Sequence, residues 1–340
     1  IGFCPHFNLN DRILYFKDMV KKHSIDAYAL DEDTALYIEN NKIMPIYALK
    51  KRHIYQFKKD NQHIMEQMEL KKLITLGPSG TFSEVAALKL SEALNEEYKI
   101  EFYPTISLAA KNIAANGFGI LPFENTLDGY VQETLDMLHK YNFYILNDIS
   151  VPVHFSFVSK NSNIANVKKI YVQFKAKGQC LDFINEHGFE IIETESNVTS
   201  YERLKNSGDT YGAIIPMHLD MSPFKCVIEN VEDSKNNNTR FLVLSTNEAN
   251  KAELCSKCSL ILEALIDEPG ILIEALVKFY ALKINLNAIM SRPTKEGLGK
   301  YYFYTEFLAN TNLDEIKGLI SRINEEGKFK IKCLGFYKTI

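Results

Sequence analysis

The chain has 340 residues, of which 46% are hydrophobic and 24% charged, and its formal net charge is −4. This length allows two or three domains with cores of their own, the composition is ordinary for a globular protein, and the small negative charge gives no reason to expect a nucleic-acid partner. No apolar run reaches the ~18 residues of a membrane span, and Asp11, Arg12 and Lys17 interrupt any apolar signal segment, so we expect a cytoplasmic protein.

Residues 1–70 form a separate region whose role the pattern does not reveal. Apolar residues at helical spacing predict a helix over residues 11–23. A second, charge-rich helix is predicted from Pro45 to about residue 73, since proline is favoured in a first helical turn. Short strands are expected between them, at residues 27–30 and 35–38.

From residue 73 onwards, apolar strands alternate with amphipathic helices, which favours an α/β fold with parallel or mixed sheets. The predicted strands are residues 73–76, 100–103, 119–122, 149–158, 169–172, 190–194, 212–215, 226–231 and 240–244. The predicted helices are residues 83–94, 107–116, 131–141, 178–187 and 198–207.

The most informative segment is the predicted strand ending at Pro122, because Glu124 and Asn125 follow it after one residue and a helix begins soon after. Polar side chains at the end of a buried strand commonly build a small-molecule site in α/β proteins. The alternative is that both residues only cap the next helix and line a turn.

Two further segments bear on this choice. Leu76-Gly-Pro-Ser-Gly-Thr-Phe-Ser-Glu84 leads from a strand into a helix, and Asn238-Thr239-Arg240-Phe241 opens another strand. With Glu124-Asn125, these segments resemble the prephenate dehydratase family, which carries LGPxGTFS, PxENS/T…GxVxxTLDLL and NxTRF in this order and at similar spacing. The resemblance covers residues 72–247.

The resemblance implies a fold of two α/β lobes with a cleft between them, as in type II periplasmic-binding proteins. Lobe one would hold residues 72–150 and 228–247, and lobe two residues 151–227. The segment 248–258 is polar and is expected to be a linker.

The resemblance also implies the reaction. Prephenate would lose carbon dioxide and hydroxide to give phenylpyruvate, with a hydrogen-bond donor at the leaving oxygen and no cofactor. Of the catalytic candidates, Thr239 matches the family residue most closely tied to the leaving hydroxyl, and Asn125 and Glu124 match its amide and carboxylate. Gln179, before Cys180, would contact the substrate from lobe two.

Four residues are candidates for holding the substrate carboxylates. Thr81 and Ser83 lie where a helix begins, and Thr81…Glu84 is a capping-box pattern that is expected to leave backbone N–H groups for an anion. Arg240 could bind a carboxylate bidentately or make a structural salt bridge on the other strand face. Val172-Gln173-Phe174-Lys175 stands where the family has Ser-His-Pro-Gln, and we hypothesise that Lys175 supplies a cation for a carboxylate that the lost serine would bind.

Lobe two departs from the family at Val172, Asn197 and Pro216, each of which stands where a hydroxyl residue is expected. Three function classes therefore remain open. They are a prephenate dehydratase with amino-acid feedback control, a lyase that removes only carbon dioxide from prephenate, and an amino-acid sensor without catalysis.

Residues 256–338 are predicted to form a ferredoxin-like βαββαβ unit, which resembles an ACT domain. Its elements are predicted at residues 259–266, 270–283, 285–291, 301–307, 313–325 and 329–337. By resemblance, an amino acid such as phenylalanine would bind at Gly270, Ile271, Leu272, Ser291 and Arg292, although Met290 replaces the family's glutamate. The alternative is a domain that only dimerises, and either way a homodimer or homotetramer is expected.

The six cysteines are scattered, which is typical of a reducing compartment. Cys255 and Cys258 form a lone CxxC without a second pair of ligands nearby. We therefore expect no metal site.

Overall fold

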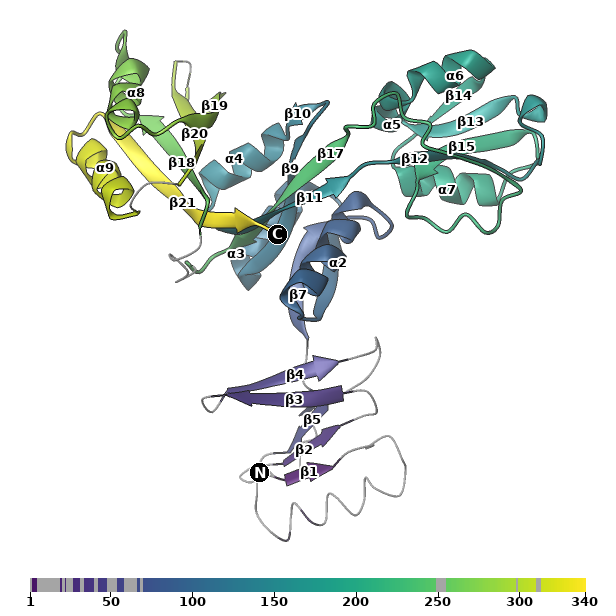
Figure 1. The fold of residues 1–340 in the computed structure, drawn as a ribbon, viewed down its shortest axis with the longest axis horizontal. Coiled ribbons are helices and arrows are strands. Elements are labelled where there is room, and N and C mark those ends of the chain that lie inside the picture. Colours follow the sequence, from purple (N-terminus) through teal and green to yellow (C-terminus); the bar gives the residue numbers. More distant parts are fainter. Residues whose placement is uncertain are drawn as a thin grey trace. The chain divides into compact units, whose positions relative to one another are not determined.

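The computed structural model describes residues 70–248, 255–297, 299–309 and 313–340, together with residues 2–4, 19, 22, 27–30, 34–39, 42–47, 54–57 and 66–67. The chain divides into two compact units (Figure 1). One comprises Ile1–Lys71 and Ser91–Lys99, and the other comprises Lys72–Leu90 and Ile100–Ile340. No described helix is long and apolar enough to cross a membrane.

The start of the chain forms strands where a helix was predicted. One sheet has the order β1-β2-β5-β6, and a separate hairpin pairs β3 with β4. The strand bounds are β1 Gly2–Cys4, β2 Ala27–Leu30, β3 Thr34–Glu39, β4 Lys42–Tyr47, β5 Ile54–Phe57 and β6 Glu66–Gln67.

The predicted helix from Pro45 to residue 73 is therefore wrong, whereas both predicted strands of this region are present. The isoleucines, tyrosines and phenylalanine of β4 and β5 favour strands. Pro45 lies opposite Leu36 in a two-stranded hairpin, where a missing N–H is tolerated. The predicted helix over residues 11–23 falls outside the described residues, except that Met19 and Lys22 are helical.

Lobe one is a mixed sheet covered by helices, and its part of the strand order is β11-β17-β9-β7-β8, with β10 paired to β9. The bounds are β7 Lys71–Leu76, α2 Phe82–Leu94, β8 Tyr98–Tyr103, α3 Ile106–Asn116, β9 Phe118–Asn125, β10 Gly129–Tyr130, α4 Gln132–Lys140, β11 Tyr144–Pro152 and β17 Asn238–Ser245. Ile120, Leu121 and Phe123 of β9 are fully buried. Strand β9 runs three residues beyond the predicted end at Pro122, so Glu124 and Asn125 belong to the sheet.

Lobe two is a five-stranded sheet with the order β14-β13-β15-β12-β16. Its elements are β12 Phe155–Ser159, η1 Ile164–Asn166, β13 Lys169–Gln173, α5 Phe174–Gln179, α6 Leu181–His187, β14 Glu190–Thr194, α7 Asn197–Lys205, β15 Tyr211–Pro216 and β16 Cys226–Glu229. The strand predicted over residues 149–158 is two strands, because the chain passes between the lobes after Pro152. The helix predicted over residues 178–187 is also two, broken at Cys180, whose φ of −131° is not helical.

The C-terminal module is a βαββαβ unit, as predicted (Figure 1). Its elements are β18 Lys257–Ala264, α8 Ile271–Ala281, β19 Leu286–Pro293, β20 Tyr301–Leu308, α9 Leu313–Glu325 and β21 Phe329–Thr339. Cys258, Leu260 and Leu262 of β18 are buried in the core that it shares with α8 and α9. The predicted class, a two-lobed periplasmic-binding-protein-like fold of type II with a ferredoxin-like module, is confirmed.

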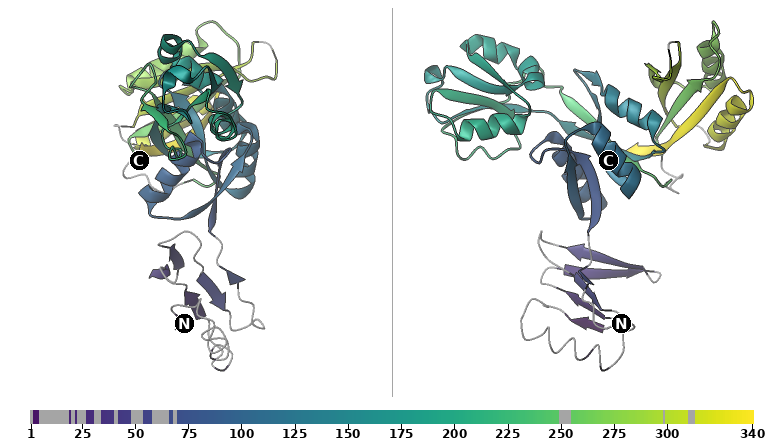
Figure 2. Two further views of the ribbon diagram at one scale, coloured as in Figure 1. Left: turned by 90° about the vertical axis from the view of Figure 1, so that its right-hand side faces the viewer. Right: turned by 180° about the vertical axis from the view of Figure 1, so that it is seen from behind.

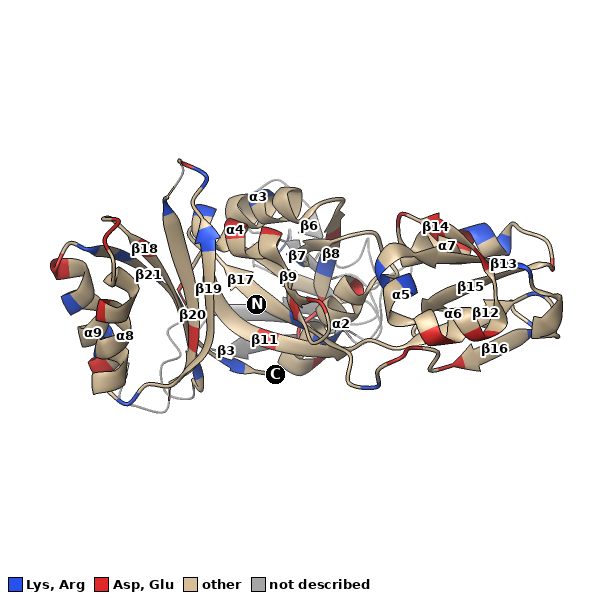
Figure 3. Ribbon diagram, turned by 90° about the horizontal axis from the view of Figure 1, so that it is seen from above, with Lys and Arg blue, Asp and Glu red and all other residues tan. Residues whose placement is uncertain are grey.

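The module and lobe one share one sheet, which was not predicted. The end of β21 pairs in parallel with β11, with Asn147 opposite Lys338 and Asp148 opposite Thr339. The result is a ten-stranded sheet running from β19 of the module to β8 of lobe one, and the long strand β21 can be followed into lobe one in Figure 2. Acidic and basic residues are interspersed over the described elements, as the small net charge leads one to expect (Figure 3).

Candidate functional site

Asn125 and Thr239 lie side by side at the ends of two antiparallel strands of lobe one. They are directly opposite each other in the register of β9 and β17. The Asn125 side-chain amide donates a hydrogen bond to the Thr239 hydroxyl, with 3.0 Å between Nδ2 and Oγ1. Two residues 114 positions apart, each predicted to act in catalysis, are therefore in direct contact.

The orientation of the Asn125 amide follows from its other contacts. Its Oδ1 accepts hydrogen bonds from the backbone N–H groups of Leu127 and Asp128, at 2.9 and 3.0 Å. The NH2 group must therefore face Thr239, which makes the Thr239 oxygen an acceptor. The Thr239 hydroxyl accepts this bond from Asn125 and donates none to another residue in the part of the chain that the structure describes. Its hydrogen therefore remains available for a bond to a ligand.

Asn237 extends this pair to lobe two. The Asn125 amide donates to Asn237 Oδ1 at 2.8 Å, and the Asn237 amide donates to Gln179 Oε1 at 2.9 Å. Asn237 is fully buried, so the polar chain Thr239–Asn125–Asn237–Gln179 joins both lobes. Sequence analysis did not single out Asn237, although the pattern NxTRF places its asparagine at this position.

Lys175 and Gln179, both on α5 of lobe two, approach the same lobe-one carboxylate. Lys175 Nζ lies 3.7 Å from Asp128 Oδ2, and Gln179 Nε2 lies 3.4 Å from that oxygen. Both contacts are long and Lys175 is exposed, so they hold the lobes together only weakly. They nevertheless direct both side chains towards Asp128 of lobe one.

Glu124 and Arg240 lie beside the Asn125–Thr239 pair but on the other face of the sheet, since successive strand residues point in opposite directions. Arg240 Nη2 is 3.0 Å from Glu124 Oε2, without the alignment of a hydrogen bond. Burial and the charge of Glu124 raise the pKa of the neighbouring Tyr130 to about 12.

The Arg240 guanidinium faces carboxylates of the protein. Its Nη1 donates to both oxygens of Glu306, at 2.8 and 2.9 Å, and lies 3.4 Å from Asp148. Burial alone would lower the pKa of Arg240, but its bond to Glu306 and the charge of that residue raise it above its ordinary value. Of the two roles left open for Arg240, the structural salt bridge is the one that these contacts favour.

The loop before α2 departs in part from the predicted capping box. The Thr81 hydroxyl donates to Pro78 O at 2.9 Å instead of accepting from Glu84 N. Glu84 does reach back, but it accepts from Gly80 N at 2.6 Å and from the Ser79 hydroxyl. Only the glutamate half of the box therefore forms, with the N–H of Gly80 in place of that of Thr81.

The same loop reaches lobe two at His218. His218 Nε2 donates to Gly80 O at 2.9 Å, and the rings of His218 and Phe82 are 5.0 Å apart. Ser83 is buried in the first turn of α2. Within the described residues, neither Thr81 nor Ser83 makes a recorded hydrogen bond to the Asn125–Thr239 pair.

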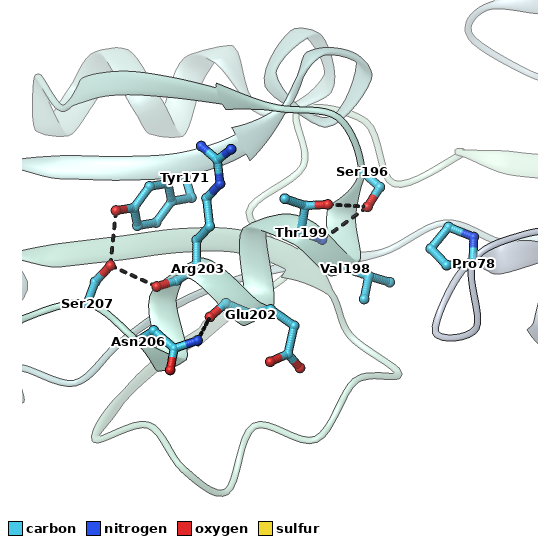
Figure 4. Close-up of a pocket in the computed structure, with 9 residues that line it drawn as sticks. All are labelled: Pro78, Tyr171, Ser196, Val198, Thr199, Glu202, Arg203, Asn206 and Ser207. Carbon is cyan, nitrogen blue, oxygen red and sulfur yellow. Dashed lines mark hydrogen bonds between the residues drawn. The ribbon is translucent and has the colours of Figure 1, made fainter. Parts of the chain in front are cut away.

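A hollow of about 410 Å³ opens beside the loop at Pro78 and is lined otherwise by lobe two, mainly α7 (Figure 4). Ser196 caps α7 by accepting from Thr199 N at 3.0 Å. The hollow does not include Asn125 or Thr239. Ser196 belongs to residues 194–197, the lobe-two segment that departs from the family pattern. Its hydroxyl nevertheless caps α7.

The three lobe-two residues that replace a hydroxyl residue of the family pattern lie in different environments. Val172 is fully buried in the core, and Pro216 ends β15 opposite Phe155. Asn197 Oδ1 is buried without a hydrogen-bond partner among the described residues. Only Asn197 therefore leaves a polar group unsatisfied where the family has a hydroxyl.

The residues predicted to bind an amino acid lie on two parts of the module. Gly270, with φ +90°, precedes α8, whose first residues are Ile271 and Leu272. A hollow of about 360 Å³ borders Ile271 and the preceding loop. Ser291 and Arg292 lie on β19, and Arg292 binds Asp136 of α4 through two nitrogens at 2.9 to 3.2 Å.

The described residues contain no cluster of three or more His, Cys, Asp or Glu side chains suited to a metal. Cys258 is fully buried and Cys255 partly so.

Comparisons with known proteins point to one family. The family model described as prephenate dehydratase matches residues 73–249. A curated prephenate dehydratase of Methanocaldococcus jannaschii is 32% identical over 271 residues, which are 78% of this chain and 98% of the relative.

Two solved structures share the fold. A prephenate dehydratase from Staphylococcus aureus superposes with a TM-score of 0.67 at 26% identity, over 78% of this chain and 99% of the other. One from Arthrobacter aurescens, in complex with L-Phe, has a TM-score of 0.68 at 23% identity, over 78% of this chain and 90% of the other.

Proposed function

This chain belongs to the prephenate dehydratase family, and from that premise we propose that it converts prephenate to phenylpyruvate at the Asn125–Thr239 pair. The enzyme is thus a carbon–oxygen lyase of phenylalanine biosynthesis. Prephenate carries a ring hydroxyl opposite a ring carboxylate. Loss of hydroxide and carbon dioxide makes the ring aromatic, so the site must hold two carboxylates and assist the departing hydroxide.

The observation that carries the proposal is the direction of the hydrogen bond within the pair. Asn125 donates to Thr239 Oγ1, which leaves the Thr239 O–H free to donate to the leaving oxygen. A threonine hydroxyl is too weak an acid to protonate hydroxide fully at neutral pH. It instead stabilises the negative charge as it develops, and the bond from Asn125 strengthens that donor by polarising it.

The residues proposed to bind the substrate differ from those that orient the Asn125–Thr239 pair. Gln179 and Lys175 lie on the lobe-two side, and Thr81 and Ser83 lie at the start of α2, where backbone N–H groups favour an anion. Glu124 would repel the substrate dianion if it took part directly. Its ion pair with Arg240 supports a role in orienting the strand ends.

A lyase that removes only carbon dioxide, or a sensor without catalysis, finds no specific support. Decarboxylation alone needs no donor at the ring hydroxyl, whereas the Thr239 hydroxyl is free and held in place.

The βαββαβ module is proposed to act as an ACT domain that binds phenylalanine at Gly270, Ile271, Leu272, Ser291 and Arg292. The solved Arthrobacter relative was obtained with L-Phe, and the ion pair of Arg292 with Asp136 links the proposed site to α4. An amino acid that binds the module differently in two arrangements would shift their populations and so change activity.

Assembly and location complete the proposal. Ile273, Val277 and Tyr280 of α8 are 64%, 58% and 80% exposed, which favours burial of this face in a homodimer or homotetramer. A biosynthetic role favours the cytoplasm.

The function is tested by incubating the intact protein with prephenate, with and without phenylalanine. Phenylpyruvate, which absorbs strongly as its enolate in base, should accumulate, and phenylalanine should slow it. A non-aromatic product would show decarboxylation alone, and no product would show that catalysis is absent.

A further inference from the structure

The C-terminal module supplies a buried carboxylate directly behind the catalytic pair. Arg240 follows Thr239 in β17 and points to the opposite face of the sheet. There its Nη1 donates to both oxygens of Glu306, a residue of β20 in the module. The contact therefore crosses from the module to the strand that carries Thr239.

Glu306 is held more rigidly than an ordinary surface carboxylate. It is 5% exposed, and its Oε2 accepts from the hydroxyls of Tyr304 and Tyr337 at 3.0 and 2.8 Å. Both hydroxyls also contact Ser259 Oγ, at 2.8 and 2.7 Å. Side chains on three strands of the module, β18, β20 and β21, thus fix the position of the carboxylate.

Arg240 links Glu306 to the strand ends that carry the catalytic pair. Its other terminal nitrogen is 3.0 Å from Glu124, and Asp148, paired with Lys257 at 2.6 Å, lies on the side of Nη1. These carboxylates compete for one guanidinium. The bond to Glu306 decides where it lies, because Nη1 is 2.8 and 2.9 Å from the two Glu306 oxygens but 3.4 Å from Asp148, and the Glu124 contact lacks the alignment of a hydrogen bond.

We infer that Glu306 is a positioning residue for the dehydration, which acts through Arg240 to hold the strand ends that carry Thr239 and Asn125. Arg240 and Glu124 are opposite each other in the register, as the pair next to Thr239 and Asn125. The regular register shifts immediately after Arg240. The ladder alone therefore fixes these strand ends loosely, and the ion pairs hold them.

Without Glu306, Arg240 can turn towards Glu124 or Asp148, and the ends of β9 and β17 can shift. A displacement of about 1 Å at a reacting group can cost about 100-fold in rate. Prephenate binding depends mainly on other groups, such as Gln179 and Lys175. The loss should therefore appear in kcat and much less in KM.

The test compares Glu306→Gln with Glu274→Gln in the full chain, using prephenate as the probe; it rests on the proposed function. Glu274 is a carboxylate of the same module whose partner is Lys328. Glu306→Gln should lower kcat between about 10- and 100-fold with KM within about 3-fold, whereas Glu274→Gln should match the wild type. An unchanged kcat for Glu306→Gln would overturn the inference, whereas an inactive wild type would instead overturn the proposed function.

A double-mutant cycle separates positioning from general stability. If Glu306 acts through Arg240, adding Glu306→Gln to an Arg240→Met variant, which can no longer bind a carboxylate, should cost little further kcat. Additive losses would contradict the inference. If Glu306→Gln does not fold, Tyr337→Phe removes one donor to the same oxygen, and it should lower kcat less but in the same direction; an unchanged kcat would then count against the inference.

Discussion

At the scale of single residues, one amide decides the chemistry. Asn125 can point its NH2 group at Thr239 only because its oxygen is occupied by two backbone N–H groups. The same geometry with a carboxylate would reverse the bond, since a carboxylate can only accept. The turn at Leu127 and Asp128 is therefore part of the catalytic arrangement.

Asn125→Asp tests this direction. The substitution keeps the shape, but the new carboxylate would accept the Thr239 hydrogen and direct it away from the substrate. We expect kcat to fall about 100-fold or more, with the fold intact by circular dichroism. A kcat within a few fold of the wild type would show that the direction of this bond is unimportant.

Asn237→Leu tests the link between the lobes. Leucine fits the volume but leaves the Asn125 amide and Gln179 Oε1 without their buried partner, so the free energy of unfolding should fall by about 1–3 kcal/mol. The measurement is chemical denaturation, with the exposed neighbour Asn236→Leu as control. Equal stabilities of the two variants would contradict the assignment.

At the scale of elements, the sequence predicted lobe one and the module well because their apolar periods are unbroken. The helices predicted over residues 83–94 and 107–116 of lobe one begin one residue inside α2 and α3 and end with them, and residues 313–325 of the module match α9 at both ends. The helix predicted from Pro45 failed because Ile, Tyr and Phe at strand spacing outweighed a favourable proline. The prediction of one strand over residues 149–158 was wrong, because the hydrophobic pattern does not change where the chain crosses from one lobe to the other.

The stability that His218 contributes beside the loop at Gly80 should depend on pH. Burial lowers the pKa of His218 below its ordinary 6.5, although the bond to Gly80 and the charge of Glu84 act the other way. The unfolded chain therefore takes up the proton first as the pH falls through about 6.5, and stability is lost below that pH.

The prediction compares the wild type with His218→Phe, which keeps a ring beside Phe82. The wild type should melt at the higher temperature at about pH 7, where the buried imidazole is neutral, and this advantage should shrink towards about pH 5, because a charged ring is less stable when buried. Thermal melts across this range provide the measurement. An advantage that is constant with pH would show that His218 does not titrate in this window.

At the scale of the whole chain, the central result is that the module and lobe one share one sheet. The family resemblance brought Asn125 and Thr239 together in the prediction, because both match active-site residues of that family. The contact between Arg240 and Glu306 was not predicted, because it depends on the pairing of β21 with β11. The sequence of a single edge strand does not show which other strand it will pair with. Arg292 is a similar case, since its partner Asp136 is 156 residues away.

Gly335 tests this junction. Its φ is +125°, and a Cβ there would lie 3.0 Å from Ile145 O on β11. Gly335→Ala should therefore lower the free energy of unfolding by about 1–3 kcal/mol. Gly327→Ala also has positive φ (+72°) but open space around it, so it should cost less in the same denaturation experiment; a larger cost there would contradict the close approach at the junction.

The most direct test of the account is the rate of phenylpyruvate formation by the wild type, Thr239→Ser and Thr239→Val under the same conditions. Serine keeps the hydroxyl beside Asn125, and valine keeps the shape without it. The account predicts clear activity for the wild type and the serine variant, and a fall of kcat by about 100- to 1,000-fold for the valine variant. A valine variant that forms phenylpyruvate at the wild-type rate would contradict the claim that the Thr239 hydroxyl eases the departure of hydroxide.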